Sequence, residues 1–341
     1  MTARLAALLL AVAPVLHAQV TDTIDVSRII IDARIWSADG TAFELTPADL
    51  RVRVDGKPAE IVSIDYVSDV SHTEPATQPA EQPEEGIEVI PPPPPRGRTL
   101  IYFVQTDFGR AAQRVVGEMQ LITNFNKFLE TLAPADRVAI LTFDSHLVLR
   151  LDFSSDREQI RKAFERVLRI EDVKPELTGA SPSLAAMLDE KTMKETATSE
   201  EALTLIAHVL RDIDGPKTMI LFGWGLSEPL GGKAWLSPRI PRISAELAAA
   251  RVTVYSFNFG VGAQMRIGLE SVAYDTGGFY TSTHGIAFDN GIKRLKVTLE
   301  GHYEIEVKNP LPSTPGKIHT LEVQGVRRGL HIEAKHTFVD R

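Results

Sequence analysis

The sequence RVAILTF, at residues 137–143, decides the fold class of this chain. It lacks the polar–apolar alternation of a strand with one face in water, as does TLIYFV at residues 99–104. Similar strands are predicted at residues 217–222 and 252–257, with helical segments between them. Strands that are apolar on both faces and separated by helices indicate a mostly parallel sheet covered on both sides. The expected fold class is therefore a doubly wound α/β domain.

Periodicity and capping residues locate the helices. Apolar side chains between residues 115 and 132 recur at steps of three and four, which places them on one face of a helix. Asp156 is the predicted cap of the next helix, and Ser199 that of a helix over residues 199–213. Further helices are predicted at residues 243–250, 265–276 and 289–297, and residues 147–153 are expected to form an edge strand beside residues 137–143.

Both flanks of this domain read as β-structure. Residues 24–67 contain short β-branched or alternating runs separated by Asp-Gly turns. Strands are also predicted at residues 302–307, 318–324 and 330–338. Each flank is too short to hold a core alone, so we expect them to pair in one sandwich of about seven strands. The alternative is that each flank packs separately on the α/β domain.

Residues 71–98 differ in composition from the rest of the chain. They hold glutamates, scattered prolines and the uninterrupted run Pro91 to Pro95. Such a segment does not nucleate a core, and the proline run is expected to be an extended polyproline helix. We interpret this stretch as a spacer; the alternative is a ligand for a proline-recognising groove.

The N-terminus predicts export. Arg4 precedes an apolar run from Leu5 to Leu16, and Ala18 follows as a small residue, the pattern of a signal peptide. The run is shorter than the roughly 20 residues that span a bilayer. We expect cleavage near Ala18, a periplasmic or secreted protein, and no transmembrane segment in the mature chain. The alternative is an apolar N-terminal helix that docks on the core.

Composition excludes several classes of function. The chain has 341 residues, with 37 Lys and Arg against 45 Asp and Glu, a net charge of −8. No basic excess would attract nucleic acid or an anionic membrane. The absence of cysteine excludes disulfides, thiolate metal sites, cysteine nucleophiles and lipid attachment through cysteine. We expect no cofactor and no nucleic-acid partner.

Residues of the α/β domain and of both flanks resemble a known family. DRVAILTFD at residues 136–144, followed by Val148 and FSSDR at residues 153–157, is similar to the second strand and following edge of a von Willebrand factor A domain. The flanking segments LTPADL at residues 45–50, VDGKPAEI at 54–61 and VRRGLHIEA at 326–334 resemble exported bacterial "VWFA-related" proteins of the acidobacterial type.

Composition, strand patterns and the resemblance together predict the following division of the chain. It comprises a signal peptide (1–18), an N-terminal β-module (19–70), a Pro/Glu-rich linker (71–98), a von Willebrand factor A-like α/β domain (99–298) and a C-terminal β-module (299–341) that pairs with residues 19–70.

The family's metal-ion-dependent adhesion site is degenerate here. The family pattern is Asp-x-Ser-x-Ser after the first strand, a Thr in a later loop and an Asp after the fourth strand, whose oxygens suit Mg²⁺. This chain has QTDFG at residues 105–109, Gly223 in place of the second Asp, and Ser181 as the nearest match for the Thr. With both charged ligands missing we expect no metal, and Asp107 and Ser181 are the remaining candidate ligands.

Other catalytic patterns are absent from the sequence. It contains no Gly-x-Ser-x-Gly elbow and no phosphate-binding Gly-Lys-Ser/Thr loop. The tail contains His302, His319, His331 and His336. Of these, His319 and His331 could face each other on paired strands and bind a metal. We expect instead that the histidines of the tail are exposed strand residues.

The sequence therefore predicts a non-enzymatic protein-binding or adhesion module that uses strand-end loops without metal. Doubly wound folds bind ligands where the strands end. Phe108 and Trp224 are the expected interface anchors, unless both rings pack under neighbouring loops. The alternatives are metal-dependent adhesion, which Asp107→Ala would abolish, and an unrecognised hydrolase with a perturbed Ser or Asp. The candidate partner-binding residues are Gln105, Thr106, Asp107, Phe108, Ser181, Trp224 and Leu226.

Overall fold

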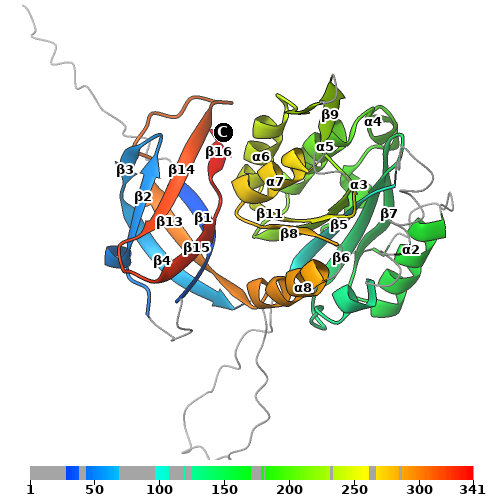
Figure 1. The fold of residues 1–341 in the computed structure, drawn as a ribbon, viewed down its shortest axis with the longest axis horizontal. Helices are drawn as coiled ribbons and strands as arrows, with labels where there is room; N and C mark the ends of the chain where they lie inside the picture. Colours follow the sequence, from blue (N-terminus) through cyan, green and yellow to red (C-terminus); the bar gives the residue numbers. More distant parts are fainter. Residues whose placement is uncertain are drawn as a thin grey trace, which may run out of the picture.

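A computed structural model shows a β-sandwich and an α/β domain lying side by side (Figure 1). The predicted signal peptide and nearly all of the predicted linker lie outside the described residues, as do Asp107 and Phe108. Among the helices that are described, none is long and apolar enough to cross a membrane. The described residues are 28–37, 44–68, 97–106, 119, 125–169, 178–179, 181–230, 233–260, 266–283 and 286–340.

A six-stranded sheet forms the centre of the α/β domain, in the order β12-β11-β8-β5-β6-β7. All neighbours are parallel except β6 and β7, which pair antiparallel at one edge. This confirms both the predicted doubly wound class and the predicted edge strand. The strands are β5 (Thr99–Gln105), β6 (Arg137–Phe143), β7 (Leu147–Ser154), β8 (Lys217–Gly223), β11 (Val252–Asn258) and β12 (Tyr280–Ser282).

Helices cover both faces of this sheet, as the apolar strands require. Ile101 and Phe103 of β5 pack on one side with residues of α5 and α6, while Tyr102 packs on the other with residues of α2 and α8. Of the predicted helix over residues 115–132, the structure describes residue 119 and residues 125–129 as helical. The helices are α2 (Arg157–Arg169), α3 (Leu184–Met187), α4 (Glu190–Lys194), α5 (Ser199–Arg211), α6 (Ile240–Ala249), α7 (Ile267–Asp275) and α8 (Ile286–Thr298).

The two flanks of the chain pair into one sandwich, as expected. One sheet has the order β15-β1-β13-β4 and the other β16-β14-β2-β3, so both sheets combine N-terminal with C-terminal strands. Ile31, Val54, Ile305 and Leu321 meet in the core between them. The strands are β1 (Arg28–Ser37), β2 (Leu50–Val54), β3 (Lys57–Ala59), β4 (Ile61–Ser68), β13 (Gly301–Lys308), β14 (Ile318–Gly325), β15 (Leu330–Ala334) and β16 (Thr337–Val339), with a short 3-10 helix at Pro47–Asp49.

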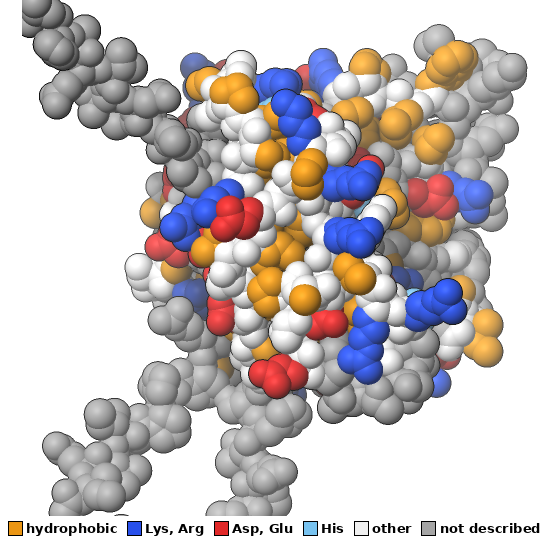
Figure 2. All heavy atoms as spheres, turned by 90° about the vertical axis from the view of Figure 1, so that its left-hand side faces the viewer, with side chains coloured by type: hydrophobic (Ala, Val, Ile, Leu, Met, Phe, Trp, Pro, Cys, Tyr) orange, Lys and Arg blue, Asp and Glu red, His pale blue; other side chains and the backbone are white. Residues whose placement is uncertain are grey.

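The outward surface of the sandwich carries side chains of both charges with hydrophobic ones between them (Figure 2). Cross-strand pairs explain part of this mixture, because Arg53 of β2 lies opposite Glu322 of β14. Opposite charges on facing strands stabilise the pairing of those strands.

Two local predictions are corrected, and one element had not been predicted. The strand expected at residues 330–338 is two strands, since the His336 amide bonds to the Asp275 carbonyl at 2.8 Å and the chain crosses from one sheet to the other. The cap of α5 is Thr198, whose hydroxyl accepts from the Glu201 amide, so Ser199 is the first helical residue. An antiparallel hairpin of β9 (Ser227–Leu230) and β10 (Lys233–Leu236) was not expected.

Candidate functional site

Three neighbouring parallel strands end at one edge of the six-stranded sheet. Gln105 ends β5, Gly223 ends β8 and Asn258 ends β11, and Gly223 lies opposite Asn258 in the strand register. The carboxyl ends of parallel strands form the ligand-binding edge of doubly wound folds. We call this group of strand ends and the loops that follow them the carboxyl edge.

The Gln105 side chain forms the centre of the carboxyl edge. Its amide nitrogen donates to the Ser199 hydroxyl at 2.8 Å and to the Gly225 carbonyl at 2.9 Å. Its amide oxygen accepts from the backbone amide of Trp224 at 3.0 Å. The side chain is 1% exposed, so these bonds replace water. One neutral amide therefore joins the end of β5, the start of α5 and the loop after β8.

The Gln105 side chain occupies the space that a side chain at position 223 would need. A Cβ atom on Gly223 would lie 2.4 Å from the Gln105 amide oxygen and 3.0 Å from a methyl carbon of Leu221. A larger side chain such as that of aspartate does not fit at this position unless the Gln105 amide leaves its bonded position. The residues at positions 105 and 223 thus depend on each other.

A second neutral amide follows the same design at β11. Asn258 is buried; its nitrogen donates to the Tyr280 hydroxyl at 2.8 Å and its oxygen accepts from the Gly260 amide at 2.7 Å. Burial raises the pKa of Tyr280, which keeps this phenol neutral. Hydrogen bonds between uncharged groups thus hold the ends of β5 and β11.

The remaining candidates at this edge differ in exposure. The Thr106 hydroxyl donates to the Phe143 carbonyl at 3.1 Å. Trp224 is half-buried against the core, with part of its side chain open to solvent. Leu226 is 1% exposed and belongs to the core under α5 and α6, so it does not present a surface to a partner.

Ser181 lies elsewhere, which corrects the prediction that it joins this edge. Its carbonyl accepts from the guanidinium of Arg137, the first residue of β6, at 3.2 Å. The reason is that β7 runs antiparallel and returns the chain to the amino ends of the parallel strands. Ser199 lies beside Gln105 instead, and the Thr198 cap at the start of α5 is the sequence signal that could have located it.

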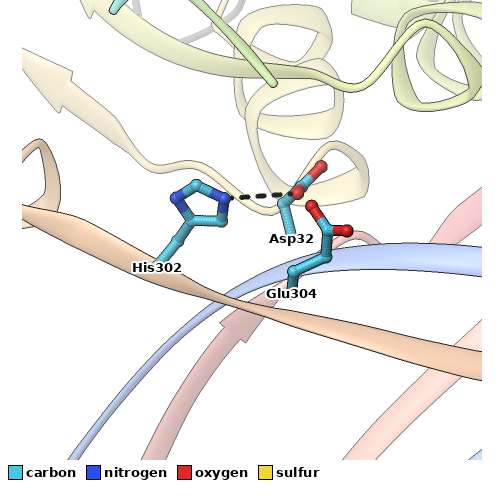
Figure 3. Close-up of side chains that lie close together, drawn as sticks. All are labelled: Asp32, His302 and Glu304. Carbon is cyan, nitrogen blue, oxygen red and sulfur yellow. Dashed lines mark ion pairs between the residues drawn. The ribbon is translucent and has the colours of Figure 1, made fainter. Parts of the chain in front are cut away.

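A charged cluster lies between the two domains, at the amino end of β11 and thus at the opposite end of that strand from the carboxyl edge. Asp32 of β1 and His302 and Glu304 of β13 bring one ligand-type atom each within 4.8 Å of one another (Figure 3). Arg251, which precedes β11, donates to both carboxylates at 2.5 Å. Burial raises the pKa of Asp32, but the bonds and charge of Arg251 outweigh it and hold that pKa below its ordinary value.

This arrangement has the residue types of a metal site, but a guanidinium already bridges the two acids. Arg251 belongs to the α/β domain, whereas Asp32 and Glu304 belong to the sandwich. Arg34 of β1 adds a second link, donating to the Thr298 carbonyl at 2.9 Å. The cluster therefore connects the domains by ion pairs that are buried at Asp32 and partly exposed at Arg251 and Glu304.

Two of the tail histidines are buried, which corrects the expectation that they are exposed. His302 lies in the charged cluster, and His319 lies between Asp55, at 2.8 Å, and Asp340, at 3.0 Å. Burial raises the pKa of Asp55, but hydrogen bonds from Thr320 and His319 lower it by more, so this pKa lies below its ordinary value. His331 does not face His319; it stacks on Trp36.

This chain is similar to several solved structures. No protein-family model and no curated protein matches the chain. Human COPII-coat protein Sec24c is 12% identical over 72% of this chain, with a TM-score of 0.39, and the match spans 43% of Sec24c. The manganese-loaded TRAP protein of Plasmodium vivax is 14% identical over 71% of this chain and 94% of that one, with a TM-score of 0.40.

A von Willebrand factor type A protein from Catenulispora acidiphila is 10% identical over 71% of this chain and 66% of that one, with a TM-score of 0.38. The α/β assignment rests on the strand order and register of this chain's own sheet.

Proposed function

We propose that this chain is an exported, non-enzymatic protein-binding module whose partner binds at the carboxyl edge without a metal ion. The observation that carries the proposal is the buried Gln105 amide, bonded to Ser199, Trp224 and Gly225 at the centre of that edge. Divalent cations are held by charged oxygen ligands, and site charge sets much of the affinity. Hydrogen bonds among neutral groups stabilise the loops there instead.

The loops of this edge favour a protein partner. Trp224 is half-buried, so its ring is fixed by the core while part of it reaches solvent. Partly exposed aromatic rings on rigid supports are frequent anchors of protein interfaces. Partner binding is thus expected to depend on Trp224 and, from the sequence, on Phe108.

The first test is a calorimetric titration of Mg²⁺ and Mn²⁺ into residues 19–341 after treatment with a chelator. The proposal expects heats no larger than those of dilution. Saturable binding at millimolar or tighter affinity would contradict it and support metal-dependent adhesion, and Asp107→Ala would then show whether Asp107 is a ligand.

The second test is capture of a partner from an extract of the source cells. The unaltered chain and a Trp36→Ala control, whose tryptophan is exposed on β1 of the sandwich, are expected to retain the same protein in the presence of EDTA. Trp224→Ala is expected to lose it. Retention by the Trp224 variant, or loss of binding in EDTA, would contradict the proposal.

Export is tested by the mass of the protein recovered from the source cells. Cleavage after Ala18 predicts a mature chain that begins at Gln19. Recovery of the full-length chain from the cytoplasm would contradict this part of the proposal.

A further inference from the structure

A groove of about 570 Å³ opens where the sandwich meets α8. It lies at the start of β13, between the end of β1 and the end of β4, and residues of α8 form its remaining wall. Its lining includes three aromatic side chains, Trp36, Tyr66 and Tyr303, together with Val297 and Lys293.

The aromatic rings are open to solvent but held in place. Trp36 is 42% exposed and Tyr66 is 60% exposed, values that single them out among the aromatic residues that the structure describes in the sandwich. Tyr66 packs edge-on against Tyr303 with ring centroids 5.1 Å apart, and Trp36 stacks on His331 at 5.6 Å. Rigid rings lose little conformational entropy when a ligand covers them.

The position of Tyr66 depends on the absence of a side chain at Gly301. A Cβ atom there would lie 2.4 Å from the Tyr66 hydroxyl oxygen. The tyrosine therefore lies directly against the β13 backbone, which forms the floor of the groove.

Both ends of the segment 69–96 lie at this groove. Ser68, the last described residue before it, is opposite Gly301 in the strand register. On the other side, the Arg98 guanidinium donates to the Leu299 carbonyl at 2.8 Å, one residue before Glu300 of the groove. The proline run 91–95 is thus attached to the chain within two residues of Gly97, beside the groove.

We propose that Pro91–Pro95 binds in the groove of Trp36, Tyr66 and Tyr303, within the same molecule. Rigid grooves lined by aromatic rings are the recurring binding sites of polyproline helices. Such helices lose little conformational entropy on binding because they are already extended. Five residues of such a helix span about 15 Å, at ~3.1 Å per residue.

Charge supports the same occupant. Lys293, which lines the groove, and Lys296 are exposed on α8. The residues that precede the proline run include Glu84, Glu85 and Glu88. Because the segment is part of the chain, its effective concentration at the groove is on the order of millimolar, so even weak intrinsic affinity gives substantial occupancy.

The test uses the full chain and a variant in which all five prolines of 91–95 are serine. The probe is a fluorescein-labelled peptide with the sequence of residues 84–96, followed by fluorescence anisotropy. The serine variant is expected to bind the peptide saturably, and the unaltered chain at least about tenfold more weakly, because its own segment competes. Absence of binding to the serine variant up to about 1 mM would overturn the proposal, a ceiling set by that effective concentration.

Equal affinity of the two proteins would also overturn it, since the groove would then be empty in the unaltered chain. Dimerisation of the unaltered chain that the serine substitutions abolish would do the same, by placing the segment in a second copy.

Groove variants locate the binding in the serine background. Trp36→Ala is expected to weaken the peptide by about tenfold or more, as for an interface anchor. The matched control Trp235→Ala, with a tryptophan that is 60% exposed on β10, should not change its affinity. Val297→Glu adds an acidic side chain at an exposed helical position without altering the core, and should also weaken binding. Unchanged affinity in both groove variants would overturn the assignment.

Discussion

The carboxyl edge and the interface between the two domains use polar residues in opposite ways. At the edge, where doubly wound folds bind ligands, Gln105 and Asn258 are neutral amides bonded to their neighbours. At the interface, Asp32, Glu304 and Arg251 are charged and mostly withdrawn from water. The comparison indicates that charge in this chain joins the domains, while hydrogen bonds between neutral groups hold the carboxyl edge.

The largest effect is expected from Arg251→Met. It leaves two acids at the interface without their shared partner, and breaking a buried pair in this way costs about 3 kcal/mol or more. Urea unfolding at pH 7 measures the loss. Arg161→Met, which removes two exposed ion pairs on α2, is the control and should change the unfolding free energy little. Similar losses in both variants would show that the interface pairs do not connect the domains.

Gln105→Leu tests the hydrogen bonds between neutral groups at the carboxyl edge. The substitution keeps approximate volume but leaves the Ser199 hydroxyl and the Trp224 amide without their partner, at a cost of about 1–3 kcal/mol. Gln324→Leu, at an exposed position of β14, is the matched control. If thermal and urea unfolding show equal stability for the two variants, water replaces the Gln105 bonds and the edge is not closed.

Gly223→Ala sharpens the link between the two edge positions. The added Cβ meets the Gln105 amide oxygen, and crowding of this kind in a packed region costs about 1–3 kcal/mol. The same substitution should cost less in a Gln105→Ala background, where that oxygen is gone. A double-mutant cycle in urea gives the coupling, and strict additivity would refute the spatial link.

The smallest effect is a pH dependence at the interface. Burial lowers the pKa of His336 from its ordinary value of 6.5, although Asp275 acts in the opposite direction. The folded state therefore favours the neutral ring, so the contribution of His336 is complete above pH 6.5 and decreases as pH falls below it. Unfolding free energies between pH 7.5 and 5.5 should show this slope (a range chosen to bracket about 6.5). His336→Gln should reduce it, and an unchanged slope would assign it to another group.

Sequence reasoning located elements better than positions in space. The cap at Asp156 and the pairing of the two flanks were predictable, because capping and the small size of each flank are local or compositional properties. Ser181 was misplaced because nothing local says at which end of the sheet a loop lies once β7 has reversed direction. His302 and His319 were expected in water because burial depends on partners hundreds of residues away.

The sequence by itself determined the layered α/β class, since strand patterns that are apolar throughout need no partner to be recognised. Tertiary structure decided which residues meet: Gln105 with Ser199 and Gly223, Asp32 and Glu304 with Arg251, and Trp36 and Tyr66 at one groove. The contact of Arg251 with the two acids joins strands of both flanks to the inserted domain. Chain folding alone brings such distant positions together.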